Sequence, residues 1–293
     1  MRRRVLFLVF ATLAACSPQA STPSSSGTPS PTPVASPSAL GVGHETGATD
    51  VILRLSSGGG LMFPEIRALD APTFTLYGDG TFVAKPAGAP PPPIGGAAPV
   101  EPQPAWRTGQ LDEAEIQVLI GEAVRLLGPA KARYELNTVM DAPTTTFFAE
   151  AEGTAKTVEV YALGMETPDS PDAAVRAQFA AFAEQLSTFG DEGTVESEPY
   201  GADAYRAVLI ESGPGVGAPA RPWPWPELMP DDFTAPADPT GLALPSRTLS
   251  DEEFQALGSP AVGGGLTGMY VKAPEGDRVY ALALRPLLPD EVA

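Results

Sequence analysis

A single cysteine constrains how this chain can be stabilised. Cys16 is the only cysteine among the 293 residues, so no disulfide can close within the chain. Exported domains with small apolar cores commonly depend on such bridges. The folded part of this chain must therefore be held by an apolar core of its own, which requires a long stretch of ordinary globular sequence.

The cysteine stands at the end of a short apolar run. Arg2, Arg3 and Arg4 precede the run from Val5 to Ala15, which only Thr12 interrupts. A basic start, a short apolar stretch and small residues before a cleavage point are typical of a secretory signal. The run has 11 residues, whereas a membrane-spanning helix needs about 20. Residues 1–15 are therefore predicted to be a signal peptide.

The sequence LAAC at positions 13–16 resembles the lipobox of bacterial lipoproteins. That resemblance implies cleavage after Ala15, a thioether-linked lipid on Cys16 and acylation of the new N-terminus. Two or more acyl chains provide stable anchoring. We therefore expect the protein at the cell membrane, lipid-anchored through Cys16 and facing the extracytoplasmic side. A secreted protein with a chance cysteine is the alternative.

The acidic balance of the chain limits its partners. The formal net charge is −18, and loss of the three arginines with the signal peptide would lower it to −21. Such a charge repels nucleic acid at long range. We therefore expect no nucleic-acid partner and a membrane contact made only through the lipid.

Composition divides the remaining chain into a tether and a globular part. Residues 16–49 are rich in Pro, Ser and Thr and contain the only histidine, His44. Such a segment buries too little apolar surface to fold and is predicted to be a disordered tether. Residues 50–293 are predicted to form two halves, 50–190 and 191–293, packed as one globular unit.

Local patterns predict hairpins and capped helices. Residues 72–85 (PTFTLYGDGTFVAK) alternate around a Gly-Asp-Gly turn and indicate a hairpin, and residues 144–163 indicate a second one. Asp112 and Glu115 form a capping-box pattern before a helix that Gly128 ends. Its predicted buried stripe is Ile116, Leu119, Ile120, Ala123, Leu126 and Leu127. A further helix is predicted from Ser170-Pro171 to Gly190.

Three segments of the first half recur, in the same order, in the second. Residues 51–60, 107–121 and 144–164 are similar to residues 205–215, 247–258 and 267–287. Each series predicts a strand, a capped helix and a hairpin. We therefore predict an α+β fold in which antiparallel hairpins pack with a few amphipathic helices, and interpret the recurrence as a degenerate duplication. Chance similarity is the alternative.

Several kinds of catalytic site lack the residues they need. Ser-His-Asp and Cys-His systems require an imidazole base, and His44 and Cys16 lie in the predicted tether. Zinc sites of His and Cys fail for the same reason. The glycine clusters are not followed by the predicted helix that a phosphate-binding loop of the G-x-G-x-x-G type requires, and no lysine stands in an S-x-x-K context.

Carboxylates are abundant enough for two further hypotheses. A pair of suitably spaced acids can hydrolyse glycosides. However, Asp112, Glu113, Asp251, Glu252 and Glu253 stand at predicted helix starts, where negative charge is favourable. No cofactor is predicted. Calcium is an alternative because oxygen ligands are plentiful in GDGT and PDDFTAPADPTG, although neither matches an EF-hand loop.

Trp223 and Trp225 alternate with prolines in RPWPWPELMPDDFTAPADPTG, residues 221–241. Two alternating indoles on a stiff backbone can form a stacking surface for a sugar or a peptide. The competing interpretation is that the segment crosses the domain and buries both indoles. Trp223 and Trp225 are the candidate ligand-binding residues.

The series PTFTLYGDGTFV, a capped helix, DAPTTTF, KTVEVYALG and RPLLPDE resembles uncharacterised lipoproteins and secreted proteins of high-GC bacteria. The resemblance covers most of residues 50–293 and implies an envelope location and a shared fold, without any activity. We therefore expect a membrane-anchored, non-catalytic binding or structural module of the cell envelope, with a glycan, peptide or protein as partner. A carboxylate-dependent hydrolase of cell-wall glycans is the alternative.

Overall fold

The computed structural model describes residues 41–60, 67–86, 101–102, 104–191, 193, 195–212, 219–237, 243–258 and 266–292. Contacts between residues group Gly41 to Ala293 into one unit. The predicted signal peptide, Cys16 and the predicted tether as far as residue 40 lie outside the described residues. The last part of that tether, residues 41–49, is described, and its contacts show that the predicted boundary is wrong.

Residues 41–49 lie against the folded unit instead of continuing the tether. The Val42 N–H donates to Gln117 Oε1 at 2.7 Å, and Gln117 Nε2 donates to the Val42 carbonyl at 2.9 Å. The Glu152 N–H donates to the Gly43 carbonyl at 2.7 Å. The His44 side chain is only 5% exposed. The boundary predicted at residue 50 is therefore wrong by nine residues, because these contacts depend on backbone groups that composition does not reveal.

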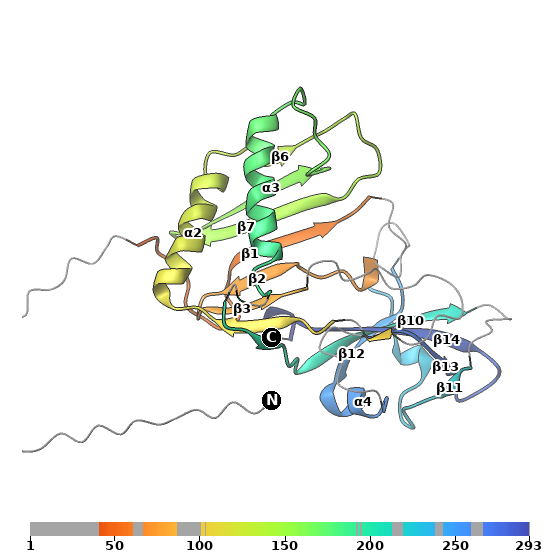
Figure 1. The fold of residues 1–293 in the computed structure, drawn as a ribbon. Coiled ribbons are helices and arrows are strands. Elements are labelled where there is room, and N and C mark those ends of the chain that lie inside the picture. The colour runs from red at the N-terminus through yellow and green to blue at the C-terminus, as the bar shows by residue number, and fades with distance from the viewer. Residues whose placement is uncertain are drawn as a thin grey trace, which may run out of the picture. The chain divides into compact units, whose positions relative to one another are not determined.

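Within the described residues, the first sheet has eight strands in the order β6-β8-β7-β1-β2-β3-β5-β9 (Figure 1), all from the first predicted half except β9, which comes from the second. Neighbouring strands are antiparallel except β6 and β8. The strands are β1 (Val51–Gly58), β2 (Phe74–Tyr77), β3 (Thr81–Ala84), β5 (Arg107–Gln110), β6 (Arg133–Tyr134), β7 (Thr144–Ala151), β8 (Thr154–Tyr161) and β9 (Glu198–Pro199). Both hairpins predicted in this half are therefore confirmed.

Two helices, α2 (Glu113–Leu127) and α3 (Ala173–Ser187), lie across the same face of this sheet (Figure 1). The capping box is formed: the Glu115 N–H donates to Asp112 Oδ1, and the Asp112 N–H donates to Glu115 Oε2, both at 2.9 Å. All six residues of the predicted stripe on α2 are buried. They pack against inward-facing strand residues such as Leu53, Phe147 and Val158 in one apolar core.

The second helix is shorter than predicted at both ends, and it ends at Ser187 instead of at Gly190. Ser170 and Pro171 belong to a turn, and the helix begins at Ala173 after Asp172, whose φ is +57°. Arg176, which the sequence analysis gave no role, is fully buried on this helix. Its Nη2 donates to the carbonyls of Tyr161 and Ala162 at 2.6 and 3.0 Å. The guanidinium thereby holds the loop that follows β8.

The second half forms most of another sheet, whose strands run β11-β13-β14-β10-β12, and β4 from the first half also pairs with β13. The strands are β4 (Glu101–Pro102), β10 (Ala204–Ser212), β11 (Arg221–Pro222), β12 (Ser246–Ser250), β13 (Leu266–Lys272) and β14 (Val279–Pro286). Helix α4 (Asp251–Gln255) follows β12, and Ser250 with Glu253 forms its capping box. Together the two halves establish the predicted α+β class.

The recurrence predicted from the sequence is found in the order of the elements along the chain. It is not found in the way their strands pair within the two sheets. In the first sheet β1 pairs with β7, the first strand of its hairpin. In the second sheet the corresponding strand β10 pairs with β14, the second strand of its hairpin. A simple duplication would keep the same neighbours. The two halves therefore share a series of local structures without sharing one topology.

The C-terminal residues connect the two sheets. Helix α5 (Pro289–Val292) follows β14, and Asp290 Oδ1 accepts hydrogen bonds from Arg54 Nη2 at 2.8 Å and from the Tyr77 hydroxyl at 2.6 Å. Glu291 accepts two hydrogen bonds from Arg285, each at 2.7 Å. We name this set of contacts the C-terminal latch, because it ties strands β1 and β2 to the end of β14.

The capping box of α2 gives a direct test of the helix start. Replacing Asp112 by alanine removes the acceptor for the Glu115 N–H, and we expect a loss of about 1 kcal/mol in the free energy of unfolding. Asp112→Asn keeps an acceptor at the same position and should stay near the parent. Urea unfolding followed by circular dichroism measures both variants; equal losses would contradict the assigned cap.

The latch predicts a pH dependence of stability. Burial raises the pKa of Glu291, but the hydrogen bonds and charge of Arg285, the Leu288 N–H and the charge of Arg206 outweigh burial and hold the pKa below its ordinary value of 4.5. The stabilisation is present above that value and is lost as the pH falls through the folded pKa. Glu291→Gln should be less stable at pH 7 and should lose less stability on acidification.

The matched control for this measurement is Glu275→Gln, which changes an exposed carboxylate in the turn between β13 and β14. Its urea unfolding should follow the parent curve across the same pH range. If the free energy of unfolding changed equally with pH in Glu291→Gln and in the parent, the latch would not be the source of this pH dependence.

Candidate functional site

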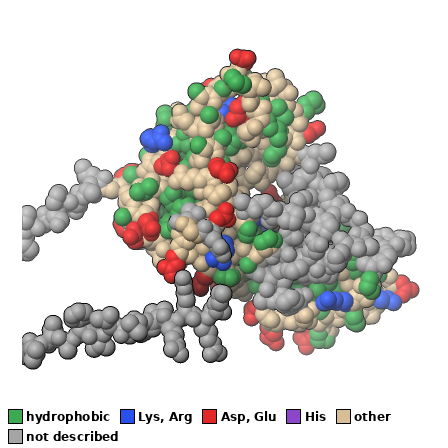
Figure 2. All heavy atoms as spheres, in the orientation of Figure 1, with side chains coloured by type: hydrophobic (Ala, Val, Ile, Leu, Met, Phe, Trp, Pro, Cys, Tyr) green, Lys and Arg blue, Asp and Glu red, His purple; other side chains and the backbone are tan. Residues whose placement is uncertain are grey.

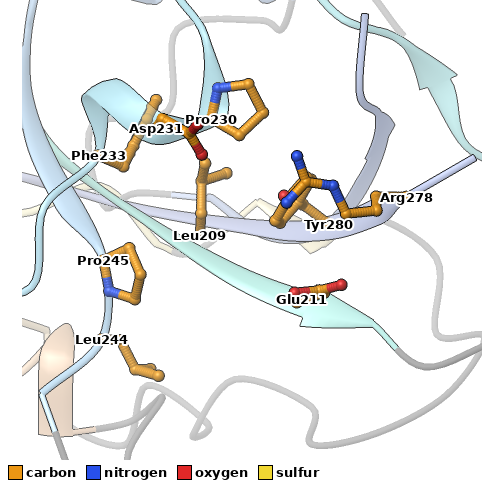
Figure 3. A pocket seen from close by; sticks show the side chains of 9 residues that line it. All are labelled: Leu209, Glu211, Pro230, Asp231, Phe233, Leu244, Pro245, Arg278 and Tyr280. Atoms are coloured by element: carbon orange, nitrogen blue, oxygen red, sulfur yellow. The ribbon is translucent and has the colours of Figure 1, made fainter. Parts of the chain in front are cut away.

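A cavity of about 480 Å³ lies on the second sheet (Figure 3). One side of it is formed by β10 and by the start of β14. The other side is formed by the Pro-rich segment of residues 221–237, which we name the strap, and by Leu244 and Pro245 before β12. The cavity therefore gathers residues from four separate parts of the chain.

The inner part of the cavity is apolar. Leu209 on β10, Phe233 on the strap and Tyr280 on β14 are exposed by 2%, 4% and 7% and line it. Glu211 and Tyr280 are directly opposite one another in the β10–β14 ladder, and directly opposed residues of an antiparallel pair share one face. The ladder register thus sets one carboxylate beside the buried aromatic ring.

Three charged side chains line the cavity together with these apolar groups: Glu211, Asp231 and Arg278. The Arg278 guanidinium carbon lies 5.8 Å from the centre of the Tyr280 ring (Figure 3). Within the described part of the chain, none of these three side chains makes an ion pair, whereas Arg285 and Glu291 of the latch pair with each other. Charges of both signs are therefore free to meet a ligand.

Burial and the same three charges affect the pKa of the Tyr280 hydroxyl. Burial raises its pKa, the nearby charge of Arg278 lowers it, and Glu211 and Asp231 raise it further, with a net result above the ordinary value. The phenol therefore stays protonated near neutral pH, so it offers one hydrogen-bond donor and one acceptor beside the charged groups.

The two candidate tryptophans support the cavity wall. Trp225 is 4% exposed, and its indole N–H donates to the Glu253 carbonyl at 2.7 Å. Trp223 is half-buried, and its indole N–H donates to the Leu228 carbonyl at 2.6 Å. Their rings meet edge to face with centroids 5.3 Å apart. The structure places these indoles in the apolar core of the second half, so they do not offer an open pair of stacking faces.

The same indoles position the residues that line the cavity. Phe233 lies 5.9 Å from Trp225 and 6.3 Å from Trp223, ring centre to ring centre, and Trp223 lies 6.3 Å from Tyr280. Between Trp225 and Phe233 the chain forms a short 3-10 turn, Pro230–Asp232, where the Met229 N–H donates to Asp232 Oδ2 at 2.7 Å. The turn carries Pro230 and Asp231 into the cavity wall.

Sequence reasoning missed Glu211, Asp231 and Arg278 as a group. They stand in no common motif, and only the strand register and the fold of the strap bring them together. The alternating Trp-Pro series was the one usable signal, because it marked the strap as a segment held by large side chains.

A second hollow, of about 270 Å³, lies on the first sheet and is lined by Val51, Arg54, Ser56, Thr146, Phe148 and Thr157. Its one charged residue, Arg54, already pairs with Asp290 of the latch. This hollow therefore offers fewer free groups to a ligand than the cavity on the second sheet.

Several of the other carboxylates singled out in the sequence have structural partners. Besides the two capping boxes, Asp79 Oδ1 accepts the Thr81 N–H at 2.9 Å and closes the turn of its own hairpin. Among the residues that the structure describes, no three His, Cys, Asp or Glu side chains gather where they could hold a metal ion. In the same residues, no helix is both long and apolar enough to cross a membrane.

Comparison with known proteins gives no relative for this chain: no family model, no curated protein and no solved structure matches it.

The strap contacts predict unequal effects for the two tryptophans. Trp225→Ala removes a buried indole and should lower the free energy of unfolding by about 3–5 kcal/mol. Trp225→Phe keeps most of the buried ring and leaves the Glu253 carbonyl without its donor, so we expect a loss of about 1–3 kcal/mol. Trp223→Phe, at the half-buried partner, is the matched control and should lose less. Chemical unfolding measures all three, and a Trp225→Ala protein as stable as the parent would contradict the assigned packing.

Proposed function

We propose that this protein is a lipid-anchored binding module that faces the extracytoplasmic side of the cell membrane. The anchoring rests on the basic start, the short apolar run and the LAAC sequence that ends in Cys16. The binding role rests on one observation, the cavity whose apolar inner part is bordered by the charges of Glu211, Asp231 and Arg278, which form no ion pair with another described residue.

The size and the lining of the cavity support a binding role. Ligand sites are typically concave and mostly apolar, with a few polar groups that orient the ligand, and they enclose about 300–1,000 Å³. The cavity on the second sheet has this composition and a volume of about 480 Å³. Held at the membrane by Cys16, the cavity would meet molecules outside the cytoplasm.

The acidic surface is consistent with the same proposal. Acidic side chains are scattered over the described surface in Figure 2 and do not gather in one patch. With a formal net charge of −18 for the whole chain, long-range repulsion keeps the protein from anionic lipid headgroups and nucleic acid. The lipid then remains the membrane contact, and the cavity remains free for its ligand.

The alternative is a carboxylate-dependent hydrolase of cell-wall glycans. Glu211 and Asp231 would be its two acids, because both line the same cavity. A general acid of this kind needs a raised pKa. Burial in an apolar pocket is the usual cause of such a rise, whereas Glu211 and Asp231 are both exposed. We therefore favour binding over hydrolysis.

Lipidation is tested by metabolic labelling of cells that produce the full chain. The parent should incorporate radioactive palmitate and remain with the membrane fraction. Cys16→Ser lacks the thiol and should incorporate no label, whereas Ser17→Ala, its neighbour, should be labelled like the parent. A labelled Cys16→Ser protein, or an unlabelled parent, would contradict the anchor.

A further inference from the structure

We infer that the cavity on the second sheet binds a short apolar peptide with free ends, whose backbone extends the open edge of β10. The inference deepens the proposed binding function and rests on it. Its support comes from three features of the described residues: the open strand edge, the placement of charges of both signs, and the apolar inner part of the cavity.

The part of the β10 edge that no described residue covers, which we call the open edge, lies at Glu211. The pairing of β10 with β12 covers Ala204 to Val208, and the Leu209 N–H still donates to the Pro245 carbonyl at 2.9 Å. Along an antiparallel strand, backbone groups of alternate residues point to the same side. The N–H and carbonyl of Glu211 therefore point toward the β12 side, where no described residue pairs with them.

An open strand edge favours a peptide over other small ligands. A peptide that adds to such an edge gains main-chain hydrogen bonds, while pockets beside the edge receive its alternate side chains. Glu211, which carries this edge, lines the cavity, and so does Leu209. A bound peptide can therefore pair with the backbone of Glu211 and place an apolar side chain against Leu209 and Phe233.

The charges fit the two ends of such a peptide. Arg278 can pair with a terminal carboxylate, and Asp231 and Glu211 can pair with a terminal ammonium group. In the described residues these three side chains have no ion-pair partner within the protein, so binding breaks no ion pair. The volume of about 480 Å³ limits the ligand to a few residues.

The test is calorimetric titration of the full-length chain in detergent with the tripeptide Ala-Leu-Ala. Binding should weaken about tenfold when the N-terminus of the peptide is acetylated or its C-terminus is amidated, because each change removes a charge-assisted hydrogen bond. Phosphocholine carries both charges and no peptide backbone, so it should not compete. Competition by phosphocholine, or equal affinity for the blocked peptides, would overturn the inference.

Matched variants identify the site. Arg278→Gln should lose the preference for a free C-terminus, and Asp231→Asn should lower the preference for a free N-terminus. Arg221→Gln and Glu227→Gln change exposed charges on the same strap that do not line the cavity, and should bind like the parent. Thermal unfolding by circular dichroism confirms that each variant is folded.

The outcomes separate this inference from the proposed function. No binding of the tripeptide, together with binding of a cell-wall glycan that Asp231→Asn abolishes, would retain the binding module and reject the peptide. Palmitate labelling reports on the anchor independently of either result. If neither the tripeptide nor the glycan binds the folded, labelled protein, the peptide inference and the binding role of the cavity both fail, while the anchor stands.

Discussion

The hydrogen bond from the Trp225 indole to the Glu253 carbonyl, within its apolar cluster, is the interaction on which the candidate site depends. The strap is rich in proline, which has no N–H to donate to a sheet. Such a segment cannot be held along its length by a strand ladder: backbone pairing holds it at Arg221–Pro222 and at Thr234, and between these points large side chains hold it. Trp225 reaches α4, Phe233 packs against both indoles, and the cavity forms between these anchors and β10.

Charged side chains have different surroundings in the C-terminal latch and in the cavity on the second sheet. In the C-terminal latch, Arg54 pairs with Asp290 and Arg285 pairs with Glu291, and these ion pairs connect the two sheets. In the cavity, Glu211, Asp231 and Arg278 have no such partner among the described residues. Partly buried charges that are paired support a fold, whereas unpaired charges beside an apolar surface are available to a ligand. This contrast separates the latch from the candidate site.

Local structure was predictable from the sequence where neighbouring residues determine it. The hairpin around Gly78-Asp79-Gly80 and the helix capped by Asp112 follow from turn and capping chemistry over a few residues. The end of the predicted tether was not predictable, because residues 41–49 are held by Gln117 and Glu152, about 75 to 109 positions away along the chain. The burial of Arg176 likewise depends on contacts outside its own helix, with the carbonyls of Tyr161 and Ala162.

Sheet order and the candidate site required the structure for the same reason. The recurring segments indicated the same elements in both halves, but not that β1 and β10 would pair with different strands of their hairpins. The Trp-Pro series indicated an unusual segment, and burial was one of its two interpretations. That Asp231 on this segment would lie near Tyr280 and Glu211 depends on the register of β10 with β14 and on the packing of Phe233.

Hydrogen exchange of the Trp225 indole N–H, followed by nuclear magnetic resonance in deuterated water, tests the central claim most directly. The account predicts slow exchange, because this N–H is bonded to the Glu253 carbonyl beneath a strap that must open before solvent can reach it. Exchange at the rate of free indole would show that the strap is not held there, and the cavity wall described above would not exist.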